Sequence, residues 1–398
     1  MNKIHFGILM ILAVLPQALF SQQPGFEISG HLDGLKDGET VALGNRFADD
    51  RYLTITDSCK VIHGDFHLKG GGVPGGPRLY EIVFDEGRHR KHPLGEDRNA
   101  GGITCLLLVD NGQKIVIHGG DINKMRDSEF SGEVSIEGSP TTTAMEQLIP
   151  LYINYSWSYS LISDRMDKVQ DSVGFDPSLL QGYMDAKFAL DDALGRILKG
   201  PISLGHKPAI PFLLAQFENY HADFLPYVYE SLDAAAKNSY YGKILRDNAR
   251  LAIGQPLPGF TLPTIENKMV SLKDVDSKSK ITLVHIWASN SVRKEKYQKE
   301  LKIAYKRYHD KGLDIVGVSA DTAEEDWRKW VLVEQFPWVN VSDLKGHMKG
   351  GIVQDVYHEG GHYIPNTTNI LLDSEGKIIA WDVNGPELFW YLKKIFGE

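Results

Sequence analysis

One pentapeptide in the last fifth of the sequence has the residue types of a metal centre. His358-Glu-Gly-Gly-His362 matches the H-E-x-x-H pattern of zinc peptidases, in which a helix places both imidazoles on one side of the metal and the glutamate acts as base. Two consecutive glycines oppose that helix. The segment is therefore predicted to be a loop, with a metal site as the less favoured alternative. No metal or other cofactor is expected.

A serine and a lysine three positions apart form a second candidate for chemistry. Ser291 and Lys294 follow the apolar run Ile281–Trp287 after a short polar turn, and Ser-x-x-Lys is the spacing of serine-lysine acylases. No His or Asp stands beside Ser291 in the sequence to act as its base. Ser291 is therefore predicted to cap the following helix by accepting a backbone N–H bond, and Arg293 and Lys294 to be solvated.

The sequence contains only two cysteines, Cys59 and Cys105, and both lie in segments predicted to be strands. If the chain is exported to an oxidising compartment, the two can form a disulfide. The alternative is that both are small buried hydrophobic residues. Neither precedes a predicted helix, so neither has the environment that makes a thiol reactive.

The candidate at Ser291 is positioned by a predicted strand, helix and strand. Ile281–Trp287 is an apolar run of strand length, and Leu313–Ser319 is a second one, rich in branched residues. Lys311-Gly312 ends the helix between them with a residue that tolerates the left-handed conformation. The apolar face of this helix, which is predicted to pack on a sheet, consists of Tyr297, Leu301, Ala304, Tyr305 and Tyr308.

This stretch resembles the thioredoxin-like domain of TlpA/ResA-type thiol-disulfide interchange proteins, which belong to the redoxin and AhpC/TSA group. The resemblance rests on Leu-Val-His-Ile-Trp-Ala-Ser, Arg-Lys-Glu, Tyr-Lys-Arg-Tyr and Gly-Leu-Asp-Ile-Val-Gly-Val-Ser. In that family the turn carries Cys-x-x-Cys, whose cysteines fall on Ser291 and Lys294 when the count runs back from Tyr305-Lys-Arg-Tyr308 without a gap. Both cysteines are absent here, so the active site is predicted to be degenerate and no catalytic residue is assigned.

The resemblance also implies a groove for an extended peptide. In the family, a cis-proline preceding a later strand faces the Cys-x-x-Cys turn, and backbone next to it pairs with the substrate. The matching residues are Ile364 and Pro365, although the spacing from Pro365 to Asp373 is two residues longer than the family pattern. Trp287, Asn290, Ser291, Ile364 and Pro365 are therefore predicted to line one surface cleft.

Two functional classes remain open from the sequence. In the first, the chain is a redox-inactive thioredoxin-fold module that binds an exported protein or peptide partner. In the second, it is a thiol-disulfide oxidoreductase or antioxidant protein that acts through Cys59 or Cys105. The first is favoured because no cysteine stands in the thioredoxin-like stretch. An insulin-reduction assay with dithiothreitol separates the two classes.

The composition and the N-terminal segment indicate where the protein acts. The 398 residues carry a net charge of −9 without a long basic run, so nucleic acid is not expected as a partner. Met1–Gln23 contains Lys3, the apolar run Phe6–Leu15 and Pro16, which is the pattern of a secretory signal. No later run is long enough to span a membrane. The family resemblance places the mature protein in the periplasm.

The fold class predicted is multidomain α+β. A signal peptide over 1–23 is followed by an antiparallel β domain over 24–138, a helical region over 139–252 and an α/β thioredoxin-like domain over 253–398. Within the β domain, Phe26–Leu43 is predicted to be a hairpin around Lys36-Asp-Gly38. This domain resembles a β domain of unknown function that often precedes TlpA-like modules. The oligomeric state is not predicted.

Overall fold

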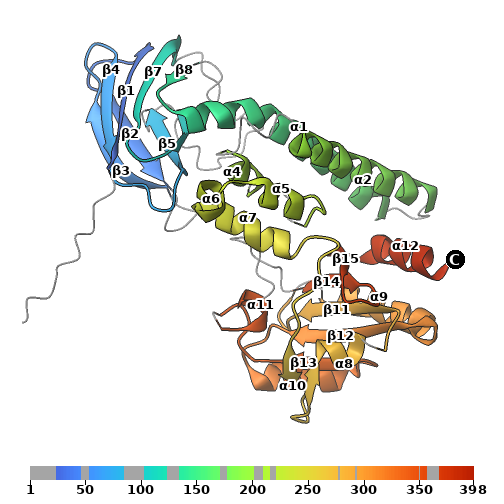
Figure 1. Ribbon diagram of the computed structural model, residues 1–398. Helices are drawn as coiled ribbons and strands as arrows, with labels where there is room; N and C mark the ends of the chain where they lie inside the picture. Colours follow the sequence, from blue (N-terminus) through green and yellow to red (C-terminus); the bar gives the residue numbers. More distant parts are fainter. Residues whose placement is uncertain are drawn as a thin grey trace, which may run out of the picture.

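The computed structural model divides into a β sandwich, a helical region and a C-terminal α/β module, with the helices between the other two (Figure 1). Because some segments are not described, structural statements below concern these residues: 24–45, 53–84, 103–122, 134–170, 177–200, 209–215, 221–276, 278–291, 294–348, 350–355 and 367–398. None of the helices in these ranges is long and apolar enough to cross a membrane.

The β sandwich consists of two four-stranded sheets that share one apolar core. The first has the order β4-β1-β7-β8 and the second the order β3-β2-β5-β6. All neighbouring strands are antiparallel except β1 and β7, which are parallel. The bounds are β1 Phe26–Asp33, β2 Thr40–Asn45, β3 Thr54–Lys60, β4 Asp65–Gly70, β5 Arg78–Phe84, β6 Ile103–Val109, β7 Lys114–Asp121 and β8 Ser135–Glu137.

The hairpin predicted over Phe26–Leu43 is wrong. β1 pairs with β4 and β7, whereas β2 pairs with β3 and β5 in the other sheet. The turn at Lys36-Asp-Gly38, where Gly38 has φ +85°, therefore carries the chain from one sheet to the other. Alternating apolar residues fix which face of a strand is buried, but they do not identify the strand that pairs with it.

The helical region begins where Ser139 ties the first helix to the sandwich. Its Oγ accepts the backbone N–H of Thr142 at 3.3 Å and donates to the carbonyl of Leu108 on β6 at 3.2 Å. Serine serves well here because it satisfies a free N–H at the start of the helix. The helices are α1 Pro140–Gln170, α2 Pro177–Lys199, α4 Ile210–Leu214, α5 Leu225–Ser231, α6 Ala234–Asn238 and α7 Tyr240–Arg250.

The C-terminal module has a five-stranded sheet with the order β13-β12-β11-β14-β15. The central strand β11 is parallel to β12 and antiparallel to β14. Every residue of β11 is buried, which explains why its sequence is a continuous apolar run rather than an alternating one. The prediction that the strands near 281–287, 313–319 and 369–373 share one sheet is confirmed. The bounds are β11 Ile281–Trp287, β12 Leu313–Ser319, β13 Val339–Ser342, β14 Thr367–Leu372 and β15 Ile378–Trp381.

Helices cover both faces of this sheet. The face that contains Leu283 packs against α9 and α12, and the face that contains Val284 packs against the core that includes residues of α8 and α11. A hairpin of β9 and β10 precedes α8. The remaining bounds are β9 Thr261–Pro263, β10 Met269–Ser271, α8 Leu272–Asp276, α9 Lys294–Tyr308, α10 Glu324–Glu334, α11 Ile352–Asp355 and α12 Gly385–Phe396.

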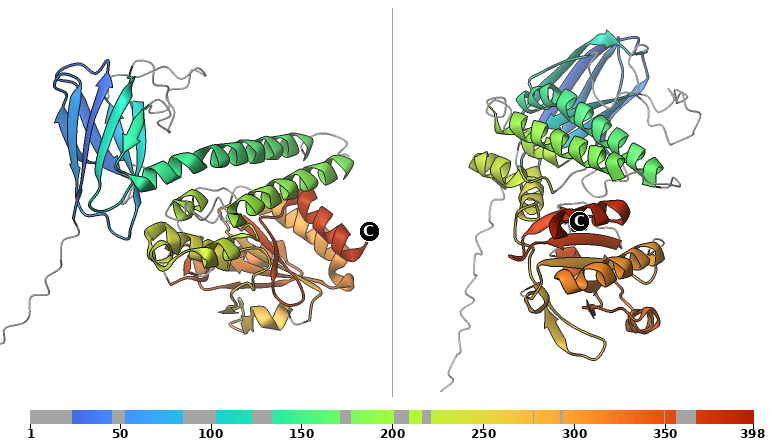
Figure 2. Two further views of the ribbon diagram at one scale, coloured as in Figure 1. Left: turned by 45° about the horizontal axis from the view of Figure 1, so that its top comes forward. Right: turned by 90° about the vertical axis from the view of Figure 1, so that its right-hand side faces the viewer.

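Helix α2 joins the helical region to the C-terminal module. Leu180 and Met184 in its first half belong to the same core as the sheet residues facing α12, whereas Leu194 and Leu198 in its second half belong to the core of the helical region. Lys187 of α2 also forms an ion pair of 3.2 Å with Glu387 of α12. Figure 2 shows α2 lying along the module beside α12. The two regions are therefore packed against each other rather than joined by a linker alone.

The linker itself is fixed by stacked rings. His221 and Trp381 of β15 stack with centroids 3.8 Å apart and an angle of 4° between the ring planes. The indole Nε1 of Trp381 donates to the carbonyl of Leu251 at 2.9 Å. Beyond this point, Gly254 and Gln255 form backbone hydrogen bonds with Ile378 at the edge of β15. The chain thus enters the module as an extra strand-like segment that covers this edge of the sheet.

Candidate functional site

The candidate site is the turn between β11 and α9. The carbonyl of Trp287 accepts the N–H of Ala320 at 2.7 Å, and the N–H of Ser291 donates to the carbonyl of Ala288 at 3.1 Å. These bonds close the turn at the end of the two central parallel strands. Open α/β sheets place their sites at this edge, beyond the carboxyl ends of the strands.

Ser291 meets the start of β14. Its Oγ lies 2.6 Å from Oγ1 of Thr367, the residue that pairs with Trp287 in the register of β11 and β14. The hydroxyl was predicted to cap the helix; Val292 and Arg293 lie outside the described residues, so this remains a prediction, and the hydroxyl's hydrogen bond to a described residue is the one to Thr367. α9 begins at Lys294, three residues later. The position that the family resemblance assigns to the first cysteine therefore carries a half-buried hydroxyl directed at the neighbouring strand.

Among the described residues, the residue of β14 that faces the turn is Thr367, which lies opposite Trp287 in the register of β11 and β14. Ile364, Pro365 and the pentapeptide His358–His362 lie outside the described residues, so their predicted roles remain predictions. Among the residues that the structure does describe, no cluster of His, Cys, Asp or Glu could hold a metal ion.

A buried carboxylate holds the turn, and the sequence analysis missed it. Oδ1 of Asp321 accepts from both the backbone N–H and the hydroxyl of Ser289, at 2.8 and 2.7 Å. Oδ2 accepts from the hydroxyl of Ser319 at 2.9 Å. Asp321 is only 6% exposed, and such a carboxylate requires several donors. It therefore connects the end of β12 to the turn that carries Ser291.

A second buried polar pair lies within the sheet two residues before Trp287. Nδ1 of His285 is 2.8 Å from Oδ1 of Asn369 on β14. The amide nitrogen of Asn369 already donates to the carbonyl of Val383 and to Oδ1 of Asn384, so Nδ1 of the histidine carries the proton. Burial lowers the pKa of His285 to about 4, and the bond to Asn369 opposes this shift only in part. The imidazole is neutral at pH 7.

The predicted groove residues occupy different environments. Trp287 is fully buried and its ring packs 5.5 Å from that of Phe336, so it cannot line a surface cleft as predicted. Asn290 is exposed next to the half-buried Ser291. The reason is that helices cover both faces of the sheet, and Trp287 lies on the same face as Leu283 and His285, which α9 and α12 cover. Of the described candidates, only Asn290 and Ser291 reach the surface.

The two cysteines are free thiols in the β sandwich. Cys59 pairs with Val41 across β3 and β2, and Cys105 pairs with Ile82 across β6 and β5. Two strands separate β3 from β6, which corresponds to roughly 14 Å at a strand spacing of about 4.8 Å. A disulfide needs Cα atoms within about 7 Å. The disulfide considered from the sequence is therefore incompatible with the fold.

The two thiols differ in environment, and neither is favourable for catalysis. Cys105 is fully buried, as predicted. Cys59 is only partly buried, and burial raises its pKa above the ordinary value for a thiol. A higher pKa leaves less of the reactive thiolate at neutral pH. Neither cysteine belongs to the module that contains the turn.

Comparison with known proteins places the C-terminal module in a family. A family model, the AhpC/TSA family, matches residues 253–380. The thiol-disulfide oxidoreductase ResA of Bacillus anthracis is 28% identical over 170 residues, which cover 41% of this chain and 90% of ResA. ResA of Bacillus cereus (strain ATCC 10987 / NRS 248) is 29% identical over 171 residues, again covering 41% and 90%.

Solved structures of similar sequence come from related modules. The thioredoxin domain of a thiol-disulfide oxidoreductase from Bacteroides vulgatus is 32% identical, with a TM-score of 0.32, and the match covers 37% of this chain and 99% of that domain. The C-terminal domain of a putative thiol-disulfide oxidoreductase from Bacteroides thetaiotaomicron is 29% identical, with a TM-score of 0.32 and coverage of 36% and 96%. From the family match and the ResA relatives, the C-terminal module of this chain is a TlpA/ResA-like redoxin of the AhpC/TSA family.

Proposed function

We propose that this chain is a thioredoxin-fold protein that binds extended polypeptides without exchanging disulfides. The observation that carries the proposal is the contact of 2.6 Å between the hydroxyls of Ser291 and Thr367. A serine hydroxyl needs an adjacent base to become a nucleophile, and Thr367 is not one. In this proposal, the turn that carries Cys-x-x-Cys in thiol-disulfide exchange proteins carries the hydroxyl of Ser291 instead. This hydroxyl can form hydrogen bonds but cannot take part in disulfide exchange.

The proposed binding surface runs from the turn to the segment before β14. It consists of Asn290, Ser291, Ile364 and Pro365, and Trp287 is removed because it is buried. An extended chain that pairs with the backbone of the segment before β14 would gain affinity from main-chain hydrogen bonds. Asp321 supports this surface by holding Ser289 in place.

The alternative, an oxidoreductase acting through Cys59 or Cys105, receives no support from the site. Cys105 has no exposed surface, and Cys59 has a raised pKa. An enzyme of this kind needs an accessible thiolate. The proposal therefore assigns no redox role to either cysteine.

We further propose that the protein is exported to the periplasm. Support comes from the N-terminal pattern of Lys3 and the apolar run Phe6–Leu15, together with the resemblance to exported interchange proteins. The domain division at residues 24, 139 and 253 is part of the same proposal. Sequencing of the mature N-terminus from a periplasmic fraction tests the proposed export and signal cleavage. A chain that still begins at Met1 contradicts this proposal.

A binding experiment tests the groove. Reduced and carboxymethylated insulin B chain, labelled with fluorescein, supplies an extended peptide without free thiols, and fluorescence anisotropy measures its binding. Ile364→Asp is expected to weaken binding by about tenfold, because a charge would be desolvated against the peptide. Ile303→Asp is the matched control, since Ile303 is 59% exposed on α9. Equal affinity of the wild type and Ile364→Asp would contradict the groove.

A further inference from the structure

A cavity of about 680 Å³ opens between α2, α9 and α12. This volume lies within the range of roughly 300–1,000 Å³ found for small-molecule sites, which often occur where two domains meet. Its apolar lining comes from Leu180, Phe389 and Trp390. Lys393 and Glu300 add charge beside these side chains. The cavity therefore combines an apolar wall with a small number of polar groups.

The aromatic part of the wall is held in position. The indole Nε1 of Trp390 donates to Oε1 of Gln181 on α2 at 2.8 Å. The ring of Phe188, also on α2, lies 6.0 Å from the ring of Trp390. Because the N–H is satisfied inside the protein, the rest of the indole offers an apolar surface at little conformational cost.

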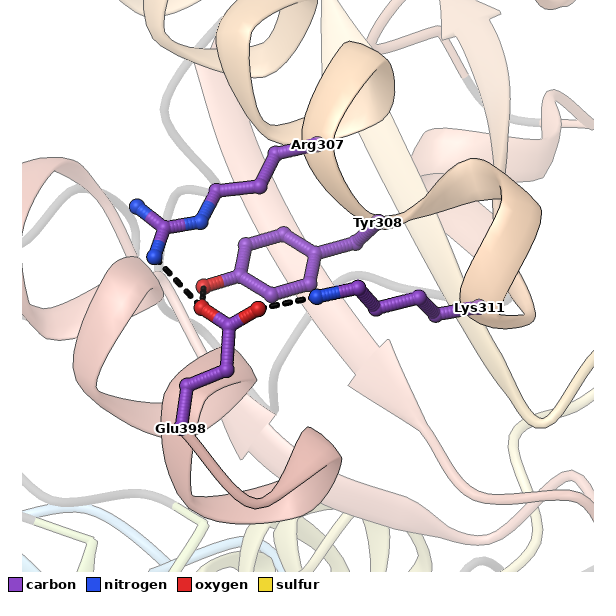
Figure 3. A network of polar contacts seen from close by, with 4 residues as sticks. All are labelled: Arg307, Tyr308, Lys311 and Glu398. Atoms are coloured by element: carbon purple, nitrogen blue, oxygen red, sulfur yellow. Dashed lines mark hydrogen bonds and ion pairs between the residues drawn. The ribbon is translucent and has the colours of Figure 1, made fainter.

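The acidic groups of the cavity already have partners. Both carboxylate oxygens of Glu398 are bound, one by Lys311 and the other by Arg307 and the hydroxyl of Tyr308 (Figure 3). These bonds lower the pKa of Glu398 to about 2. Glu300 accepts the backbone N–H of Gly385 at 3.0 Å. Both carboxylates therefore have hydrogen-bond donors, and the charge of Glu398 is matched by Lys311 and Arg307.

The lysines of the cavity are in a different situation. The side chain of Lys393 is half-buried, and it forms no hydrogen bond or ion pair with any residue that the structure describes. Lys394 lies over the ring of Trp390, with Nζ 4.7 Å from its centroid. An ammonium group beside apolar walls is stabilised when an anion takes the place of water. The cavity thus offers the ammonium group of Lys393 to a bound anion.

We propose that this cavity binds a small amphipathic anion, with a flat apolar body against Trp390 and Phe389 and an anionic group at Lys393. The apolar body would bury surface against the two rings, and the ammonium of Lys393 would select the charge. The site shares no residue with the turn at Ser291, so it extends beyond the proposed peptide-binding function and can be tested separately.

Two probes of the same shape test the proposal on the full-length protein. Isothermal titration calorimetry with 2-naphthoate is expected to show saturable binding, and 2-naphthamide, which lacks the charge, is expected to bind about tenfold more weakly. Equal affinities for the two probes, or no saturable binding of 2-naphthoate, would overturn the proposal. Binding of the insulin peptide is expected to be unchanged in the presence of 2-naphthoate.

A pair of variants locates the site. Lys393→Gln is expected to weaken 2-naphthoate by about tenfold while leaving 2-naphthamide unaffected. Lys329→Gln, at an exposed position on α10, is the matched control and is expected to bind both probes like the wild type. Thermal unfolding followed by circular dichroism establishes that both variants are folded. If Lys393→Gln binds 2-naphthoate with wild-type affinity, the assignment of the anion to Lys393 is wrong.

Discussion

Nδ1 of His285 donates a hydrogen bond to Oδ1 of Asn369 across β11 and β14, at 2.8 Å and without access to solvent. The amide of Asn369 is itself fixed by two acceptors, Val383 and Asn384. The pair therefore defines one tautomer of a neutral imidazole in the centre of the sheet. Burial disfavours protonation of His285 in the folded protein, so the stability of the module depends on pH.

This coupling predicts a loss of stability in mild acid. The pKa of His285 is about 4 in the folded protein, against about 6.5 when unfolded, so the unfolded state binds the proton more readily. Stability is thus complete above pH 6.5 and decreases as the pH falls from 6.5 to 4. The full loss corresponds to about 3 kcal/mol. Urea unfolding at several pH values, followed by tryptophan fluorescence, measures it.

The matched variant for this prediction is His285→Asn. It removes the titrating group, so its stability relative to the wild type should improve as the pH falls from 6.5 to 4. His63→Asn serves as the control, because the side chain of His63 is 86% exposed. Parallel pH profiles for the wild type and His285→Asn would contradict the buried, neutral imidazole.

Asp321 is predicted to determine the stability of the turn. In Asp321→Asn, one carboxylate oxygen becomes an amide that donates, so at least one of Ser289 and Ser319 loses its acceptor. The expected cost is about 1–3 kcal/mol in the free energy of unfolding. Asp310→Asn, at an exposed position, should change the free energy of unfolding by less than about 0.5 kcal/mol. Chemical denaturation of both variants decides the matter, and equal effects would show that Asp321 does not hold the turn.

The ion pair between Lys187 and Glu387 is predicted to fasten α2 to α12. The side chains are only 19% and 15% exposed. Burial disfavours the charge of Lys187, but the carboxylate of Glu387, together with smaller contributions from Tyr159, Tyr183 and Tyr391, outweighs this effect, so the pKa of the lysine is raised. Lys187→Met leaves Glu387 buried without a partner, and the expected cost is about 3 kcal/mol.

A double variant separates the pair from its surroundings. Lys187→Met with Glu387→Leu should recover most of the lost stability, since an apolar pair can replace a buried ion pair. Lys237→Met removes a lysine from the more exposed pair with Glu230 and should cost less than about 1 kcal/mol. Thermal unfolding compares the four proteins. A double variant that is no more stable than Lys187→Met would mean that the two residues do not act as a pair.

The sequence predicted those parts of the fold whose signals are local. β11 was recognised because a strand buried on both faces is apolar throughout, and α9 because its apolar residues recur at helical spacing. The turn at Lys36–Gly38 was misassigned because a turn does not reveal whether the next strand stays in the same sheet. The packing of α2 on two cores was missed because the apolar face of a helix does not show which other elements it packs against.

The candidate site was predicted only in part, for similar reasons. Ser291 was found because the family resemblance fixes its position relative to Tyr305–Tyr308. Thr367 was missed because the sequence does not show which residue of β14 lies in register with Trp287. Asp321 stands after a strand, where polar residues are common, so only the hydrogen bonds from Ser289 and Ser319 distinguish it.

The central claim is that the turn keeps thioredoxin geometry but lacks the sulfur needed for exchange. Insulin reduction by dithiothreitol, followed by turbidity, tests it in the wild type, in Cys59→Ser with Cys105→Ser, and in Ser291→Cys with Lys294→Cys. The wild type and the cysteine-free variant should not accelerate the reaction. The variant with restored cysteines should accelerate it, since the first sulfur would lie just before α9, whose N-terminus favours a thiolate. Acceleration by the wild type that disappears in the cysteine-free variant, or a restored variant that forms no disulfide and remains inactive, would contradict the account.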